Sequence, residues 1–272
     1  MSNGRFSGTR LFILANWPRF VLLYLGMVGA LIVIGLSALR GWYAFVLLGT
    51  AVFIILVYFI GAGVWEARQR YDLDGITTHH VLFDMGQIPA TERLAYVDLG
   101  LQLPPIGLSR RLTTGQIVVV DVYNPQWTVS AWLVRWRAQQ PHPPADPRLS
   151  WREGNLNLLP LPNESVSTVM LCHIAGEFWQ EGDRAALLRE AYRILKPRGQ
   201  LLLAESVRSQ TNWLIGGPAG FNLPTAEYWR KLLQQAGYRI RSEKDVAGLS
   251  HCIRAQKPTP AEAQQLSFKL EF

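Results

Sequence analysis

Two uncharged apolar runs near the N-terminus constrain this chain more than any other feature. Residues 20–39 and 42–64 contain no charged side chain, and Arg40 is the one charge between the two runs. A helix needs about 20 apolar residues to cross the roughly 30 Å hydrocarbon core of a bilayer, because it rises about 1.5 Å per residue. Each run meets that length. The sequence therefore predicts two transmembrane helices.

The short connection between the runs predicts a hairpin. Arg40 and Gly41 leave room only for a tight turn, so both termini lie on the same side of the membrane. A cleavable signal peptide is not expected, since no small-residue cleavage site follows the first run and a second run comes at once. Tryptophans mark the predicted interfaces, at positions 17, 42 and 65.

The distribution of arginines predicts the orientation. Arginines flank the hairpin at positions 5, 10, 19, 68 and 70 and outnumber Arg40 in the turn. The positive-inside rule then places both termini and the remaining chain in the cytoplasm, on an inner (cytoplasmic) or intracytoplasmic membrane. Small residues in the first helix permit close helix packing, either on the second helix or on another membrane protein; they are Gly26, Gly29, Ala30, Gly35 and Ser37.

The rest of the chain predicts an α/β domain. We expect a membrane anchor over 1–65, a polar and partly helical linker over 66–92, the α/β domain over 93–257 and a tail over 258–272. Short apolar runs alternate with amphipathic stretches, which is typical of a mostly parallel sheet covered by helices. The strands are expected at 95–99, 116–122, 148–152, 167–174, 200–205, 239–246 and 250–255, and the helices at 128–139, 183–195 and 225–236. The last two strands should form an antiparallel hairpin.

Three motifs in this domain resemble a known superfamily. Residues 159–165 are LPLPNES, residues 187–203 are LLREAYRILKPRGQLLL, and residues 236–238 are AGY. In this order and spacing they are similar to the class I S-adenosylmethionine-dependent methyltransferases, nearest to the ubiquinone and menaquinone C-methyltransferase branch. The resemblance runs from about residue 95 to 257. It implies a Rossmann-like fold with a mostly parallel seven-stranded sheet and a terminal antiparallel hairpin.

The resemblance also implies a cofactor site, which departs from the family pattern. The family carries D-L-G-C-G-x-G after the first strand, and this chain has DLGLQLPP over 98–105. Asp98 and Gly100 are kept, whereas Gln102 and Pro104 replace glycines. A glycine permits positive φ and close backbone approach, and proline fixes φ and removes an N–H. We expect Gln102 and Pro104 to block the usual pose of S-adenosylmethionine.

Other family positions are partly kept. The resemblance assigns Asp121, at the end of the second strand, to the ribose hydroxyls, and Asn155 replaces the acid that meets adenine. Ser167 and Arg198 also depart from the family. The vestigial cofactor-binding residues are therefore Asp98, Gly100, Asp121 and Asn155. No bound cofactor is expected, and S-adenosylmethionine is expected only if the domain is active.

Few other chemistries are expected. The net charge is +7, yet the basic residues are scattered, so no nucleic-acid partner is expected. Cys172 and Cys252 lie in predicted strands and should not form a disulfide, and the His79–His80 pair should be solvated. No metal-ligand spacing occurs. His173, with Glu177 and Glu205, is a candidate acid–base set, although ordinary polar residues at a pocket rim are the commoner explanation.

Two functions remain open. The first is a non-catalytic, methyltransferase-like subunit that stabilises or assembles a larger membrane complex, such as a respiratory or photosynthetic one. Its partners would be the lipid bilayer and other membrane-protein subunits. The second is an active methyltransferase acting on a lipophilic substrate, such as a quinone or tetrapyrrole precursor. The alternating apolar residues of 266–272 further predict a docking tail.

Overall fold

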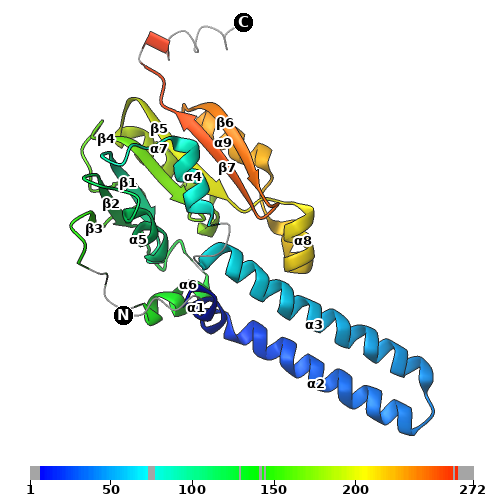
Figure 1. Cartoon of the computed structure of the whole chain (residues 1–272). Helices are drawn as coiled ribbons and strands as arrows, with labels where there is room; N and C mark the ends of the chain where they lie inside the picture. Colours follow the sequence, from blue (N-terminus) through cyan, green and yellow to red (C-terminus); the bar gives the residue numbers. More distant parts are fainter. Residues whose placement is uncertain are drawn as a thin grey trace, which may run out of the picture.

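A computed structural model describes residues 7–72, 77–128, 130–140, 143, 145–259 and 261–262. The predicted tail segment 266–272 lies outside the described residues. Two long helices project away from an α/β domain, and the described C-terminal residues lie at the opposite end of the molecule (Figure 1).

The two projecting helices match the predicted hairpin. Helix α2 runs from Trp17–Leu39 and α3 from Tyr43–Tyr71, and both are long and apolar enough to cross a membrane. Only 11% and 6% of their most apolar windows are buried, so these helices are not the core of a soluble domain. The interface between them uses small residues: Ala30 and Ser37 are buried, and Gly49 abuts Ile34. At Gly29 and Gly35 an added Cβ would meet open space.

The α/β domain contains one seven-stranded sheet in the order β3-β2-β1-β4-β5-β7-β6. The strands are β1 Arg93–Asp98, β2 Gln116–Asp121, β3 Leu149–Glu153, β4 Val166–Cys172, β5 Leu195–Glu205, β6 Arg239–Val246 and β7 Ser250–Gln256. β1 to β5 pair in parallel, and β7 is antiparallel to both β5 and β6. The predicted mostly parallel sheet with a terminal antiparallel hairpin is confirmed.

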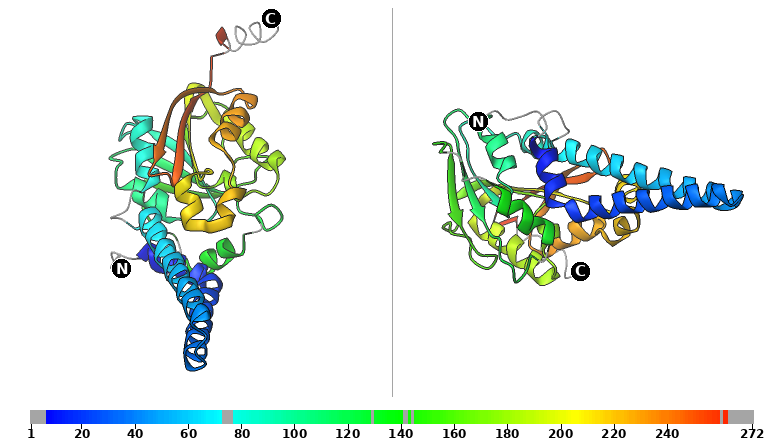
Figure 2. Two further views of the ribbon diagram at one scale, coloured as in Figure 1. Left: turned by 90° about the vertical axis from the view of Figure 1, so that its right-hand side faces the viewer. Right: turned by 90° about the horizontal axis from the view of Figure 1, so that it is seen from below.

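Helices cover both faces of this sheet (Figure 2). Along β1 the side chains alternate, so Ala95 and Val97 face one layer while Leu94 and Tyr96 face the other. The first layer holds α6 Ala131–Gln139, α7 Glu181–Ile194 and α9 Ala226–Gln235, and the second holds α4 Thr78–Gly86 and α5 Leu103–Ser109. Both layers bury fully apolar cores, as expected for a strand run buried on two sides.

The segment expected to be a partly helical linker over 66–92 contains helix in its described residues. α3 continues to Tyr71, well past the second apolar run, and α4 buries Leu82 and Phe83 against the sheet. The reason is the helical spacing of its buried residues, which gives α4 one face to bury; they are Thr78, His79, Leu82, Phe83 and Gly86. The described parts of this segment, 66–72 and 77–92, are thus packed against the rest of the protein.

A short helix before the hairpin closes this junction. Helix α1, Ser7–Ala15, lies against the last turns of α3 and against α6. Asp72 accepts hydrogen bonds from the Thr9 amide at 2.9 Å and the Thr9 hydroxyl at 2.5 Å, and its side chain is buried. An added Cβ at Gly8 would lie 2.2 Å from the Tyr71 carbonyl oxygen, so the contact requires glycine.

Candidate functional site

The predicted cofactor residues lie together at the carboxyl edge of the sheet. Asp98 ends β1 and Asp121 ends β2, and the two are register partners. Gly100 follows β1, and Asn155 follows β3 on the next strand along. This is the edge at which open α/β sheets bind ligands.

Asp98 organises the turn after β1. One of its carboxylate oxygens accepts hydrogen bonds from the amides of Gly100 and Gln102, both at 3.1 Å. The side chain is fully buried, and this burial raises the pKa of Asp98 to about 6. Gly100 and Gln102 both have positive φ, at 82° and 59°. Gln102 therefore adopts a positive φ at a position where the family has glycine.

Pro104 lies where it does not disturb this turn. With Pro105 it occupies the first turn of α5, where no helical N–H partner is needed. The missing N–H of Pro104 therefore costs α5 no hydrogen bond, and the expectation that Pro104 blocks the cofactor pose stays a prediction.

Arg137 occupies the space next to Gly100 and Asp121. Its Nη1 donates to Asp121 Oδ2 at 2.6 Å and to the Leu99 carbonyl oxygen at 2.8 Å. The guanidinium carbon lies 4.2 Å from the centre of the Tyr123 ring. A Cβ at Gly100 would lie 2.0 Å from Arg137 Nη1, so the guanidinium sits directly on the glycine turn. The acid that the resemblance assigns to ribose is thus already paired.

Asn155 takes a different position from the other three residues. It is exposed, and its Oδ1 accepts a hydrogen bond from the Asn157 amide at 3.0 Å. Ser167 and Arg198 lie farther away, at the amino ends of β4 and β5. Their departure from the family pattern is therefore not a sign of cofactor loss, because the amino edge of the sheet is opposite the edge that carries Asp98 and Asp121.

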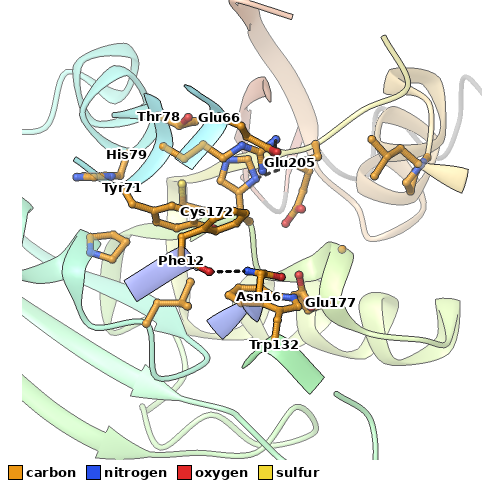
Figure 3. Close-up of a pocket in the computed structure, with 18 of the residues that line it drawn as sticks. Phe12, Asn16, Glu66, Tyr71, Thr78, His79, Trp132, Cys172, Glu177 and Glu205 are labelled. Atoms are coloured by element: carbon orange, nitrogen blue, oxygen red, sulfur yellow. Dashed lines mark hydrogen bonds and ion pairs between the residues drawn. The ribbon is translucent and has the colours of Figure 1, made fainter. Parts of the chain in front are cut away.

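A cavity of about 280 Å³ lies further along the same edge, beyond β4 and β5 (Figure 3). Its floor is formed by Cys172, His173, Glu205 and Ser206, and helices from the N-terminal region form its roof. The roof residues include Phe12 and Asn16 of α1, Arg19 of α2, and Glu66, Arg70 and Tyr71 of α3. The membrane-hairpin helices therefore close the position above β4.

His173 is held by hydroxyl groups in this cavity. Its Nε2 lies 3.0 Å from Ser250 Oγ and its Nδ1 lies 3.5 Å from Ser206 Oγ, and Ser250 in turn contacts Thr78 at 3.3 Å. Burial, followed by the nearby positive charge of Arg70, holds the pKa of His173 well below its usual range. His173 is therefore a neutral imidazole with hydrogen-bonding neighbours rather than a partner of a carboxylate.

The two candidate acids beside His173 have structural partners. Glu205 Oε1 accepts the amides of Ile174 at 2.9 Å and Ala175 at 2.7 Å, and burial raises its pKa to about 8. Glu177 accepts a hydrogen bond from the Ser130 hydroxyl at 2.5 Å, and burial raises its pKa too. The structure brings the predicted trio around one cavity, with both acids bound to other groups.

A stack of aromatic rings separates the cavity from the Arg137 cleft. Phe12 stacks on Tyr71 at 5.7 Å between ring centres, and Tyr71 packs on Trp136 at 5.1 Å. Trp136 is fully buried, and its indole N–H donates to the Leu101 carbonyl oxygen at 3.4 Å. Three separate helices, α1, α3 and α6, thus contribute to the wall beside the glycine turn.

Two minor expectations have mixed outcomes. His79 is buried rather than solvated, because α4 packs it against the domain, and this burial lowers its pKa to about 3. Cys172 and Cys252 are free and buried, as predicted. Within the described ranges no cluster of three metal-ligating side chains occurs.

Sequence reasoning missed the residues that close the site. Arg137 is 37 positions from Gly100, and nothing in the pattern of the helix over 128–139 distinguishes it from other arginines. Trp132 and Trp136, spaced i and i+4, could have indicated a buried face on α6. The sequence does not indicate that Phe12 and Tyr71 belong to the site, because their contacts depend on how α1 and α3 pack on the domain.

The comparisons with known proteins agree with this architecture. A family model described as a methyltransferase domain matches residues 107–203. A probable S-adenosylmethionine-dependent methyltransferase of Mycolicibacterium smegmatis is 32% identical over 111 residues, which is 39% of this chain. The chain spans 40% of the length of that relative. The α/β domain is thus similar in sequence to S-adenosylmethionine-dependent methyltransferases.

Solved structures show the same fold. A methyltransferase from Aquifex aeolicus has a TM-score of 0.51 at 16% identity, covering 66% of this chain and 89% of that one. Human N-acetylserotonin methyltransferase, solved with S-adenosylmethionine, has a TM-score of 0.51 at 21% identity, and the match covers 73% of this chain and 56% of that one. The [4+2]-cyclase SpnF has a TM-score of 0.50 at 20% identity, and the match covers 67% of this chain and 80% of that one. The quinone C-methyltransferase branch stays a prediction.

The superfamily implies S-adenosylmethionine, and the residues present can be tested against it. Asp98, Gly100 and Asp121 are in the family positions, and Gly100 has a positive φ. Arg137 nevertheless pairs with Asp121 and lies on Gly100. In this arrangement the guanidinium is bonded to the Asp121 oxygen that a ribose hydroxyl would use.

Proposed function

We propose that this protein is a membrane-anchored, non-catalytic methyltransferase-like subunit of a larger membrane complex. The observation that carries the proposal is the Arg137 guanidinium, which bonds Asp121 and Leu99 across the glycine turn. A charge-assisted hydrogen bond of this kind is typically worth about 1.5–3 kcal/mol, and a ligand must break it to reach the acid. The aromatic wall of Phe12, Tyr71 and Trp136 adds packing beside the same turn.

The membrane part of the proposal rests on the exposed apolar helices. α2 and α3 span the bilayer, with both termini and the α/β domain in the cytoplasm of an inner or intracytoplasmic membrane. Arginines at both outer ends of the hairpin, among them Arg19 and Arg68, support this orientation. The partners are the bilayer and other membrane-protein subunits, and no nucleic acid is involved.

Cofactor binding tests the non-catalytic role. We expect the full-length protein in lipid nanodiscs to show no calorimetric binding of S-adenosylmethionine at tens of micromolar. The variant Arg137→Ala should gain weak binding, because it frees Asp121 and the space at Gly100. Arg189→Ala, on the exposed face of α7, is the matched control and should behave as wild type. A low-micromolar dissociation constant for the wild type would contradict the proposal.

Topology is tested separately by cysteine labelling from outside the membrane. A cysteine at Gly41, in the hairpin turn, should react with an impermeant reagent. A cysteine at Thr114, an exposed residue of the domain, should react only after the membrane is opened. Labelling of Thr114 from outside would reverse the assigned orientation.

A second candidate function is favoured by the cavity. An active methyltransferase acting on a lipophilic substrate would use the 280 Å³ space above β4 and β5, which the hairpin helices roof. Tethering to the bilayer would raise the local concentration of such a substrate. Binding by the wild type in the calorimetric test would favour this function and S-adenosylmethionine as its cofactor.

A further inference from the structure

The segment between β5 and α9 has an unusual surface for a cytoplasmic loop. It contains helix α8, Gln210–Gly216, and the 3-10 helix η2, Gly217–Asn222. Residues 209–226 include no charged side chain. Three large apolar side chains on it are exposed: Trp213 at 45%, Leu214 at 48% and Phe221 at 55%. Trp213 and Phe221 lie together, with 6.0 Å between ring centres.

The opposite side of this segment is fixed to the domain. Ser209 caps α8 by accepting a hydrogen bond from the Asn212 amide at 3.0 Å. The Asn212 side chain donates to the carbonyl oxygens of Val207 at 2.8 Å and Leu249 at 3.1 Å. The exposed apolar side chains are therefore presented by an anchored segment, and rotation of that segment cannot hide them.

The segment also lies beside the hairpin. An added Cβ at Gly217 would lie 3.3 Å from the Phe59 ring, and Arg19 donates to the Ile215 carbonyl oxygen at 3.3 Å. A groove between α3 and α8 is lined by Tyr58, Gly61, Ala62, Trp65, Thr211, Leu214 and Ile215. Figure 1 shows α8 beside the domain end of α3.

These contacts give the depth of the segment. Trp65 marks the predicted membrane interface, and Phe59 lies six residues deeper in the apolar run. At 1.5 Å per residue, Phe59 is roughly 9 Å beyond Trp65 along the helix axis. Interfacial helices typically bury an apolar face about 5–10 Å into the boundary between headgroups and acyl chains. Gly217 is therefore level with lipid if α3 spans the bilayer.

We propose that α8 and η2 form a second membrane contact, which inserts Trp213, Leu214 and Phe221 into the interfacial layer of the bilayer beside the hairpin. The proposal rests on the membrane-spanning hairpin of the proposed function. Its partner is lipid rather than protein because the exposed side chains continue the lipid-facing surface of α3 at the same level. A tryptophan beside phenylalanine and leucine is typical of interfacial anchoring.

This contact also places the cavity next to the bilayer. η2 ends immediately before Leu223 and Pro224, and both of these residues line the cavity above β4 and β5. The segment thus forms the cavity wall on the side where it meets lipid. Both wall residues are uncharged.

Spin labels in the full-length protein test the proposal. Single spin-labelled cysteines are placed at four positions, one per variant, and each variant is reconstituted in lipid vesicles. Leu214 and Phe221 are the test positions, Leu48 is the reference in the hairpin, and Thr114 is the reference in water. Leu48 is 61% exposed on α3. We expect the ratio of collisions with oxygen to collisions with a nickel chelate to be several-fold higher at 214 and 221 than at 114, and highest at 48. Thermal unfolding of each variant confirms that it folds.

Three other labelling results would contradict either the second membrane contact or the hairpin. Labels at 214 and 221 that match 114, while 48 stays in lipid, would overturn the second membrane contact alone. A label at 48 that matches 114 would overturn the hairpin and with it the proposed function. Labels at 214 and 221 shielded from both reagents would show that protein, and not lipid, covers the segment.

Discussion

The carboxyl edge of the sheet is filled by side chains in one half and holds a cavity in the other. At β1 and β2, Arg137 and Trp136 fill the space beside the glycine turn. At β4 and β5, a cavity of about 280 Å³ persists beneath the roof of α1 and α3. Both halves use a buried acid in the same way, since Asp98 and Glu205 each accept two backbone amides from an adjacent loop. The acids therefore stabilise the loops whether or not a space is kept above them.

The difference lies in how the polar atoms of the β1–β2 half are paired. A cleft built for a ligand normally leaves polar atoms for that ligand to satisfy. Here Asp121 is paired within the chain, with Arg137 on one oxygen and the Tyr123 amide on the other. Substitutions in this half should therefore affect stability first.

The largest effect is expected for Trp136→Ala. The side chain is fully buried and packs on Tyr71 and Trp132, so its removal should lower the free energy of unfolding by about 3–5 kcal/mol. Thermal unfolding in nanodiscs measures the loss. Trp179→Ala is the control, because Trp179 is 79% exposed and should change little. Equal, small effects of the two variants would mean that the closed half is not packed as core.

Glu205→Gln should change the pH dependence of stability. The folded pKa of Glu205 is raised from 4.5 to about 8, so the folded state holds a proton that the unfolded state has lost. The stability of the wild type relative to Glu205→Gln is therefore greatest below pH 4.5 and decreases as pH rises through 8. At about 1.4 kcal/mol per pKa unit, the change is on the order of a few kcal/mol.

Melting temperatures of both proteins between pH 4 and 9 check this expectation. Asp98→Asn provides the matching measurement beside β1 and β2. There the decrease in wild-type stability relative to the variant should end near pH 6, because the pKa of Asp98 is about 6. Parallel profiles for wild type and Glu205→Gln would rule out a protonated Glu205.

Gly100→Ala should have an intermediate effect. The residue has a φ of 82°, and its new Cβ would meet Arg137 Nη1. The backbone cost alone is about 1–2 kcal/mol. In an Arg137→Ala background the steric part of this cost should disappear, leaving only the backbone part. A double-mutant cycle on unfolding free energies measures the coupling, and additive effects would place Arg137 away from the turn.

The smallest effect is expected for Asn155→Ala. Asn155 is exposed and supports only the Asn157 amide, so the change in unfolding free energy should stay within about 0.5 kcal/mol. Its heat of S-adenosylmethionine binding should equal that of wild type, with none detected. A binding signal in the wild type that Asn155→Ala weakens would show that adenine reaches this loop and that the cleft opens.

Much of the fold was predictable because local periodicity determines it. The uncharged runs give the hairpin, and the alternation along β1 and β2 gives a two-sided sheet. The motif over 187–203 predicts a helix followed by a strand, and the structure has α7 followed by β5, although β5 begins at Leu195 and not at the predicted residue 200. α4 was less visible, since its apolar face is short and follows a polar stretch.

The closed state of the site was only partly predictable. Gln102 and Pro104 pointed to a change at the turn, but the space is filled by Arg137 from another helix. A sequence shows which residue types depart from a family. It does not show which distant side chain takes the vacated volume, because that depends on packing between α6, α1 and α3.

Helix α3 has a mechanical consequence for the site. It is one unbroken helix of 29 residues, so it reaches roughly 44 Å at 1.5 Å per residue. One end lies at the hairpin turn, and the other ends in Tyr71, whose ring packs on Trp136 beside Arg137. Hydrophobic mismatch changes the tilt of a spanning helix. If α3 spans the bilayer as proposed, a change in its tilt would be transmitted to Tyr71 and so to the aromatic wall beside Arg137.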